Sequence, residues 1–180
     1  MGIQLDLEYF VEPTKNDYDF YNDIKNEVFE EIFALTHLKH SFITKGYCPE
    51  YDVLDTDTGK TYEVKRDYWW VITDNVLVEE YFNLEQKYKG WIFETTADYL
   101  VVFITDSIYY ITNMYKIKAD FFNNIETWSC SDIEQTKDKD GNILEKPFTT
   151  RNWLKNHNSF YCNFFKVNPN ILSSFNIDTY

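Results

Sequence analysis

The sequence has no long apolar run, few cysteines and a deficit of basic residues. No stretch reaches the roughly 18 uninterrupted apolar residues of a membrane-spanning helix. The segment from Met1 to Glu8 lacks the basic and apolar regions of a signal peptide. The three cysteines, Cys48, Cys130 and Cys162, are widely spaced without a zinc-type pairing, so they fit reduced thiols and we assign them no function. These absences predict a soluble, cytoplasmic protein.

Basic residues are outnumbered, with 17 Lys and Arg against 30 Asp and Glu and a net charge of -13. Phosphate binding normally leaves a basic footprint, so this deficit is the main difficulty for a nucleic-acid enzyme. The charge is polarised along the chain. Residues 1–31 hold nine acids against two lysines, whereas residues 146–177 contain Lys146, Arg151, Lys155 and Lys166 and no acid.

Apolar residues make up 44% of the 180 positions and aromatic residues 19%, which is typical of one folded domain and not of a disordered chain. Helical spacing of apolar side chains predicts a first helix from about Asp19 to Phe42. Glu27 and Glu31 lie one turn apart on this helix, and a solvated acidic face explains them as well as a functional role does. A second helix is expected from Lys118 to about Ser129.

Strand patterns fill the middle of the chain. The run from Tyr99 to Ile104 has the length and composition of a buried central strand. Further strands are expected at Val76–Phe82 and Ile108–Ile111, and an edge strand or extended arm is expected within residues 1–20. The other segments are an aromatic run at 68–72, a polar loop at 83–91, a charged turn at 137–142 and an aperiodic segment from Pro147.

A hairpin carries the most suggestive chemistry. Asp, Thr and Gly residues between positions 55 and 60 supply a turn, and a loop centred on Asp57 and Thr58 pairs residues whose numbers sum to 115. Asp52 then lies opposite Glu63, and Lys65 shares a face with Glu63, while Val64 points into the core.

Two facing carboxylates repel each other, unless a divalent cation lies between them. A metal there can polarise a phosphoryl oxygen and activate a water, and an ammonium can orient that water or offset developing charge. The trio of Asp52, Glu63 and Lys65 therefore suits phosphodiester hydrolysis. Alternating charges on a solvated hairpin also arise by chance.

Four sequence blocks, in their order along the chain, resemble those of the PD-(D/E)XK nuclease superfamily. Within it the resemblance is to small phage-type Holliday-junction-resolvase-like or restriction-like endonucleases. The four blocks are Glu27 in the first helix, Asp52 through Lys65, the strand from Asn75 to Glu80, and the Thr95-Thr96-Ala97-Asp98 block. The resemblance covers roughly residues 20–112. The block at Thr95 is one residue tighter than the family pattern, and the nearest proline to Asp52 is Pro49 rather than the adjacent residue.

The resemblance implies an α/β, restriction-endonuclease-like fold: an αβββαβ core with a mixed sheet flanked by helices over about residues 20–130, and a C-terminal extension over about 131–180. It implies Mg²⁺ or Mn²⁺ held by Asp52, Glu63 and the Val64 carbonyl, with Lys65 serving the nucleophilic water. Glu27 fits the helix-borne acid of the family best, with Glu30 or Glu31 as alternatives. Glu79 matches a recurrent acidic position.

The expected function is a metal-dependent DNA endonuclease, acting on branched DNA in phage or mobile-element metabolism and located in the host cytoplasm if phage-encoded. A homodimer is plausible by family analogy. Candidate DNA contacts are Arg66, Lys87, Lys89, Thr96, Arg151 and Lys155.

The alternative is a non-catalytic acidic protein that mimics DNA and binds a basic host protein, such as a defence or DNA-binding protein. The net charge of -13 suits electrostatic steering towards such a partner. A DNA mimic has no need of Lys65, whereas a nuclease depends on it.

Overall fold

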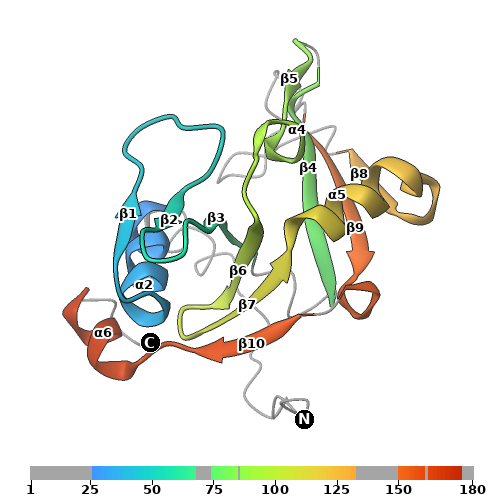
Figure 1. Ribbon diagram of the computed structural model, residues 1–180. Helices are drawn as coiled ribbons and strands as arrows, with labels where there is room; N and C mark the ends of the chain where they lie inside the picture. The colour runs from blue at the N-terminus through green and yellow to red at the C-terminus, as the bar shows by residue number, and fades with distance from the viewer. Residues whose placement is uncertain (1–25, 68–73, 85, 133–149, 161, 176–180) are drawn as a thin grey trace, which may run out of the picture.

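Two β-sheets form the framework of the protein in the computed structural model, which describes residues 26–67, 74–84, 86–132, 150–160 and 162–175 (Figure 1). The first sheet has the strand order β1-β2-β3-β6-β7-β10 and the second the order β5-β4-β9-β8. The strands of the first sheet are β1 (Ser41–Ile43), β2 (Val53–Asp55), β3 (Thr61–Arg66), β6 (Tyr99–Thr105), β7 (Ile108–Asn113) and β10 (Asn163–Lys166). Those of the second are β4 (Asn75–Asn83), β5 (Tyr88–Lys89), β8 (Ser129–Asp132) and β9 (Arg151–Asn156).

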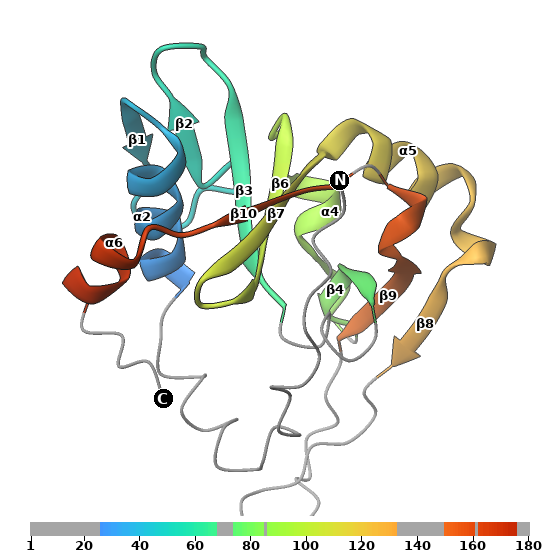
Figure 2. The same cartoon turned by 90° about the horizontal axis from the view of Figure 1, so that it is seen from below.

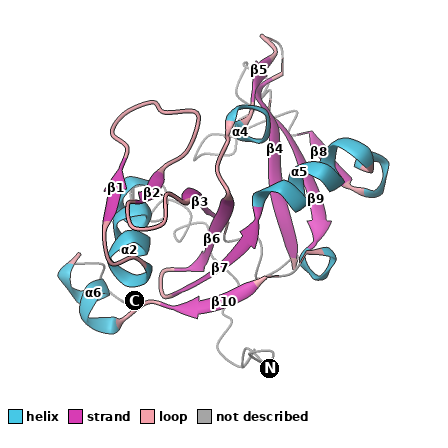
Figure 3. Ribbon diagram, in the orientation of Figure 1, coloured by secondary structure: helices cyan, strands magenta, loops and turns pink. Residues whose placement is uncertain are grey.

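Helices are short and few beside these strands (Figure 3). The α-helices are α2 (Asn26–His37), α4 (Trp91–Glu94), α5 (Met114–Asn123) and α6 (Pro169–Ser174), and two short 3₁₀ turns are η2 (Ile125–Thr127) and η3 (His157–Ser159). None of the helices in the described ranges is long and apolar enough to cross a membrane.

The first sheet is mixed, as the sequence predicted, because β3 runs parallel to β6 while the pairs β1/β2, β2/β3, β6/β7 and β7/β10 are antiparallel. Residues 67–98, which include β4, β5 and α4, connect the two parallel strands. A parallel pair requires such a crossover connection. The fold is therefore α/β with a mixed sheet.

Both faces of the first sheet are covered. Phe29, Ile32 and Phe33 of α2 pack with Val64 and Val101 on one face. On the other face, residues of the second sheet, α4 and α5 pack with Leu100 and Val102. Figure 2 shows α2 and α6 on one side of the first sheet and α5 on the other. Because consecutive side chains of β6 enter opposite cores, Tyr99–Thr105 is the buried central strand that the sequence predicted.

The hairpin has the predicted register, since Val53 pairs with Tyr62 and Leu54 with Thr61. The Asp55 carboxylate accepts hydrogen bonds from the Asp57 backbone N–H at 2.9 Å and the Thr58 hydroxyl at 2.6 Å. Gly59 adopts a φ of 73°, a region that glycine tolerates best. These local contacts explain why the turn could be predicted from its residues.

Helix boundaries were predicted less well. The first helix ends at His37 and not near Phe42, because Ser41–Ile43 pairs with β2 as strand β1. The second helix was placed too late in the sequence. It begins at Met114, where the Asn113 side chain caps it by accepting the Lys116 N–H, and it ends at Asn123, so the prediction of helix up to Ser129 was wrong.

The C-terminal segment carries more regular structure than its aperiodic sequence indicated. Strand β9 lies between β4 and β8 in the second sheet, and β10 forms an edge of the first. The predicted arm in residues 1–20, the aromatic run at 68–72 and the turn at 137–142 lie outside the described residues.

Candidate active site

Asp52, Glu63 and Lys65 come together at the start of the hairpin. The Lys65 Nζ lies 2.5 Å from Glu63 Oε1 and 3.5 Å from Asp52 Oδ2, so one ammonium bridges both carboxylates. Asp52 precedes β2, and its Oδ2 also accepts the Val64 backbone N–H at 2.7 Å. Strand β3 directs Val64 into the α2 core and Glu63 and Lys65 to the opposite face.

Burial sets the electrostatics of this trio. Glu63 is 4% exposed, and its loss of solvent raises the pKa of the carboxyl although Lys65 opposes that shift. Burial lowers the pKa of Lys65, but the neighbouring Glu63 and Asp52 outweigh it and the net pKa shift is upward. Lys65 therefore remains a cation near neutral pH, which favours binding of phosphate or positioning of water and not proton transfer by a neutral amine.

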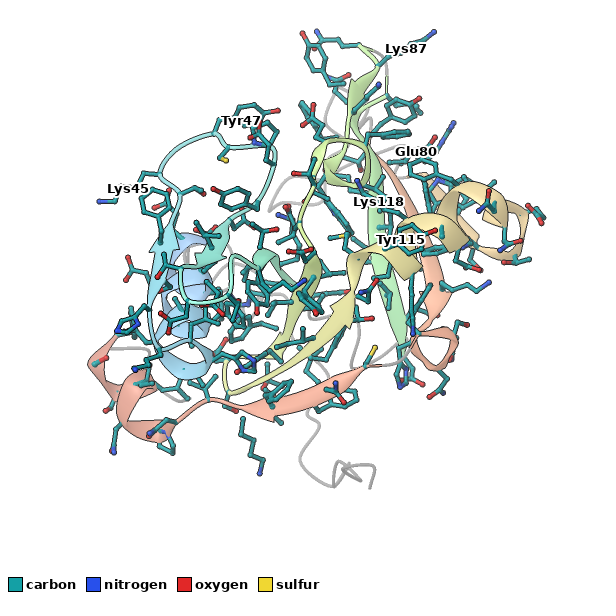
Figure 4. The ribbon with its side chains drawn as sticks, viewed as in Figure 1. Lys45, Tyr47, Glu80, Lys87, Tyr115 and Lys118 are labelled. Atoms are coloured by element: carbon teal, nitrogen blue, oxygen red, sulfur yellow. The ribbon has the colours of Figure 1, made fainter. Side chains whose placement is uncertain are left out.

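Lys118 of α5 brings a second ammonium to the site. Its Nζ donates a hydrogen bond to the carbonyl oxygen of Thr95, the residue that ends α4, and Figure 4 shows the side chain directed from α5 towards α4. Burial lowers the pKa of Lys118 and the nearby Glu63 partly offsets this. Thr95 is fully buried, and its hydroxyl donates to the Glu50 carbonyl at 3.0 Å. These contacts hold Lys118 beside the trio.

Glu30, and not Glu27, is the acid that α2 directs towards the site. Glu30 is 8% exposed, and burial raises its pKa to about 7, with Asp52 adding to the shift and Lys65 opposing it. Glu27 and Glu31 are exposed. The choice of Glu27 as the helix-borne acid is therefore corrected. Residues three or four positions apart lie on the same face of a helix, so Glu30 shares the buried face with Phe33 and Ala34. Glu27 shares the exposed face with Glu31.

Glu79 of β4 is electrostatically coupled to Lys65. Burial raises the pKa of its carboxyl, and the charge on Lys65 partly reverses that shift, which places the two side chains within electrostatic reach of each other. Gly90 packs directly against the Glu79 backbone, because a Cβ built on Gly90 would stand 2.2 Å from the Glu79 carbonyl oxygen. The Gly90 N–H donates to the Glu80 carbonyl at 2.6 Å. This close approach fixes β4 next to α4.

Asp52 and Glu63 offer the carboxylate oxygens that a hard divalent cation prefers. Glu30 and Glu79 act on this pair or on Lys65 electrostatically, and the pKa values of Glu30, Glu63 and Glu79 are raised. The Val64 N–H points to Asp52, and the N–H and C=O of one strand residue point to the same side, so the Val64 carbonyl also faces Asp52. Within the described ranges no group of three or more His, Cys, Asp or Glu is arranged to hold a metal. Mg²⁺ commonly uses only one or two carboxylates together with waters and substrate phosphate.

The candidate DNA contacts are spread over the molecule. Arg66 is corrected: its side chain is 5% exposed, its Nη2 lies 2.8 Å from Asp106 Oδ1, and its guanidinium stacks on Phe29, so it is structural. Thr96 is exposed and its N–H donates to the Glu50 carbonyl at 2.8 Å, next to the site. Lys87 and Lys89 lie on the β4–β5 hairpin.

The two candidates on β9 pair with acids of the second sheet and α5. Arg151 Nη1 lies 3.8 Å from Glu80 Oε2, and Lys155 Nζ lies 3.5 Å from Asp120 Oδ2. Lys155 also lies over the Trp128 ring. These partners partly neutralise both cations.

Nothing in the sequence indicated that Lys118 belongs to the site, and Thr95 was indicated only as part of a block that is one residue tighter than the family pattern. Lys118 reaches the trio only because α5 packs across β6, which no local pattern in the sequence reports. The family models, curated proteins and solved structures with which the chain was compared contain no match to it. The geometry of the site therefore has to carry any functional conclusion.

Proposed function

We propose that the protein is a metal-dependent DNA endonuclease of the PD-(D/E)XK type. The observation that carries the proposal is the Lys65 ammonium bridging the carboxylates of Asp52 and Glu63 in a desolvated cluster. A solvated charge pattern on an exposed hairpin would not bury Glu63 to 4% exposure. Burying charged groups is costly, and a site that needs them is the usual reason for keeping them.

The element order supports the same proposal. The elements α2, β1, β2, β3, α4 and β6 follow the αβββαβ order of such nucleases, with β3 and β6 parallel. Two features differ from the simplest form of that core. Strands β4 and β5 are inserted before α4, and α4 has only four residues.

The residues of the chain divide the chemistry between them. Asp52, Glu63 and the Val64 carbonyl would hold Mg²⁺ or Mn²⁺, which supplies Lewis-acid polarisation of the scissile phosphate and a more acidic water. Lys65 orients the attacking water and offsets charge as it develops on the phosphoryl oxygens. Lys118, which is electrostatically coupled to Glu63, would provide a second positive charge for a substrate phosphate.

The charge of the chain is compatible with a DNA substrate in this scheme. Residues 1–31 carry nine acids against two lysines, which is more than half of the net charge of -13, and one of these acids, Glu30, belongs to the site. A metal ion would neutralise two further charges within the cluster of carboxyls. Branched DNA of a phage or mobile element remains the proposed substrate, and a homodimer would allow paired cuts.

Cleavage assays test the function. The wild type should cut plasmid, linear duplex, single-stranded or four-way-junction DNA in Mg²⁺ or Mn²⁺ and not in EDTA. Glu63→Gln and Lys65→Ala should each reduce the rate by at least about 100-fold, the magnitude of losing one preorganised electrostatic group. Glu31→Gln, an exposed acid of α2, is the matched control and should cut at the wild-type rate.

Metal binding is measured separately. Mg²⁺ at about 100 times its Kd should stabilise the folded protein by about 2.7 kcal/mol, and the resulting rise in Tm should disappear in Glu63→Gln. A folded, metal-replete wild type that cuts none of these substrates would overturn the nuclease proposal. If it also failed to bind duplex DNA at low salt, the acidic DNA mimic with a basic protein partner would be favoured.

A further inference from the structure

The β4–β5 hairpin, whose strand β4 also carries Glu79, has an exposed aromatic pair. Phe82 is 51% exposed and Tyr88 is 50% exposed, and their ring centroids lie 5.4 Å apart at an interplanar angle of 32°. Neither ring belongs to the two core clusters. Contact between the rings stabilises the hairpin, and about half of the surface of each residue remains exposed.

The position of the pair is set by irregularities in β4. Its pairing register shifts at Glu80, where β4 meets β9, and again at Phe82, where β4 meets β5. An extra residue of this kind bends a strand and redirects a side chain, and such bulges are frequent next to active sites. Phe82 follows Glu79 by three residues, which is about 10 Å along a strand.

The hairpin is held against the site at its base. Gly90 contacts the Glu79 backbone so closely that no larger residue fits, and Glu79 lies within electrostatic reach of Lys65. The far end of the hairpin projects beyond both sheets, with Lys87 at its tip (Figure 4). Along the hairpin, the aromatic pair thus lies between the tip at Lys87 and the base at Glu79 and Gly90.

The charge around the pair favours a polyanion. Lys87 and Lys89 flank Tyr88 in the sequence, and Lys89 Nζ lies 5.4 Å from the centre of the Phe93 ring. Residues 82–90 contain one acid, Glu85, against these two lysines, in a chain with a net charge of -13. Exposed aromatic rings beside lysines are the means by which proteins bind single-stranded nucleic acid.

We propose that Phe82 and Tyr88 form a stacking platform for an unpaired base of the DNA strand that enters the site. This inference rests on the proposed nuclease function and gives it a substrate class, namely DNA with unpaired nucleotides such as forks, flaps or open junctions. The unpaired base stacks on the free ring faces while Lys87 and Lys89 bind the adjacent phosphates. Fully paired DNA offers no base to the platform.

Equilibrium binding in EDTA tests the platform without any dependence on cleavage. The probes are fluorescent single-stranded DNA, a forked duplex and a blunt duplex, at about 50 mM salt. Phe82→Leu and Tyr88→Leu should each weaken binding of the single strand and the fork by about 5- to 160-fold, as expected for loss of base stacking worth about 1–3 kcal/mol. Phe82→Tyr and Tyr88→Phe keep the rings and should restore the wild-type affinity. Binding of the blunt duplex should change less than twofold.

A spectroscopic readout separates stacking from a structural effect. A 2-aminopurine base in the single strand should lose fluorescence on binding to the wild type and keep it on binding to the two leucine variants. Circular dichroism confirms that the variants are folded. Any of three results would overturn the proposal of a stacking platform. They are equal losses of affinity for the single strand and the blunt duplex, unchanged 2-aminopurine fluorescence with the wild type, and a change only in self-association on sedimentation. Failure of the nuclease proposal is recognised independently, by the absence of metal-dependent cutting.

Discussion

Replacing Glu30 by glutamine should stabilise the protein at high pH and have much less effect at low pH. The Glu30 carboxyl has its pKa raised from 4.5 to about 7, first by burial and then by Asp52. A raised pKa means that the folded protein disfavours the charged form. The folded state is therefore penalised as the pH rises from the unfolded pKa through the folded pKa, and glutamine removes this penalty.

The magnitude follows from the pKa values. With 4.5 in the unfolded chain and about 7 in the folded protein, linkage gives a penalty of about 3 kcal/mol at pH 8 and about 1 kcal/mol at pH 5. Glu30→Gln should recover most of it, because glutamine has nearly the same shape and no charge. For a chain of 180 residues, a gain of about 3 kcal/mol corresponds to a rise in Tm of about 6–12 °C.

Urea unfolding in EDTA at pH 5, 6.5 and 8 measures the effect, with Glu27→Gln as the matched control. Glu27 lies on the same helix but is exposed, and its charge is a smaller cause of the raised Glu30 pKa than burial or Asp52. Its substitution should therefore change the free energy of unfolding by under about 0.5 kcal/mol at every pH. In cleavage assays Glu30→Gln should be less active than Glu27→Gln, because only Glu30 lies at the site. Glu30→Gln should therefore be more stable than the wild type and less active.

A stability gain for Glu30→Gln that is the same at pH 5 and pH 8 would refute the reasoning. So would an equal gain for Glu27→Gln, since that result would attribute the effect to the net charge of the helix and not to burial at the site.

Two further predictions concern the neighbours of the trio. Lys118→Ala should lower kcat for DNA cleavage by about 100-fold, because one positioned cation is lost. In the same assay Lys118→Arg should be less affected, and Lys116→Ala, at an exposed position, should be near wild type. Equal rates for all three variants would contradict a role for Lys118. Gly90→Ala should destabilise the protein by about 1–3 kcal/mol and lower the rate of cleavage, because the added Cβ would stand 2.2 Å from the Glu79 carbonyl oxygen. An unchanged urea midpoint would show that β4 can move away.

The parts of the structure that depend on local chemistry were predicted well. The turn residues Asp55, Thr58 and Gly59 determine the register that places Asp52 beside Glu63 and Lys65. The apolar run of β6 identified a strand buried on both faces. In each case the residues that decide the structure are close in the sequence.

The parts of the structure that depend on tertiary packing were not predicted from the sequence. Helical periodicity locates the acids of α2 but does not say which acid meets the sheet, and Glu30 is distinguished from Glu27 only by its alignment with buried residues. The start of α5 depended on the cap by Asn113, and its misplaced boundary left Lys118 outside the predicted site. The burial of Arg66 against Phe29 and Asp106 likewise has no local signal.

The parallel pairing of β3 with β6 has a consequence for the order in which the candidate site is assembled. The hairpin with Asp52, Glu63 and Lys65 is short in sequence and can close early, whereas Thr95 and Lys118 arrive only after residues 67–98 have folded back across the sheet. During synthesis the half-made site therefore emerges before the groups that complete it. The hairpin residues therefore meet Thr95 and Lys118 only when β6 and α5 have docked against β3.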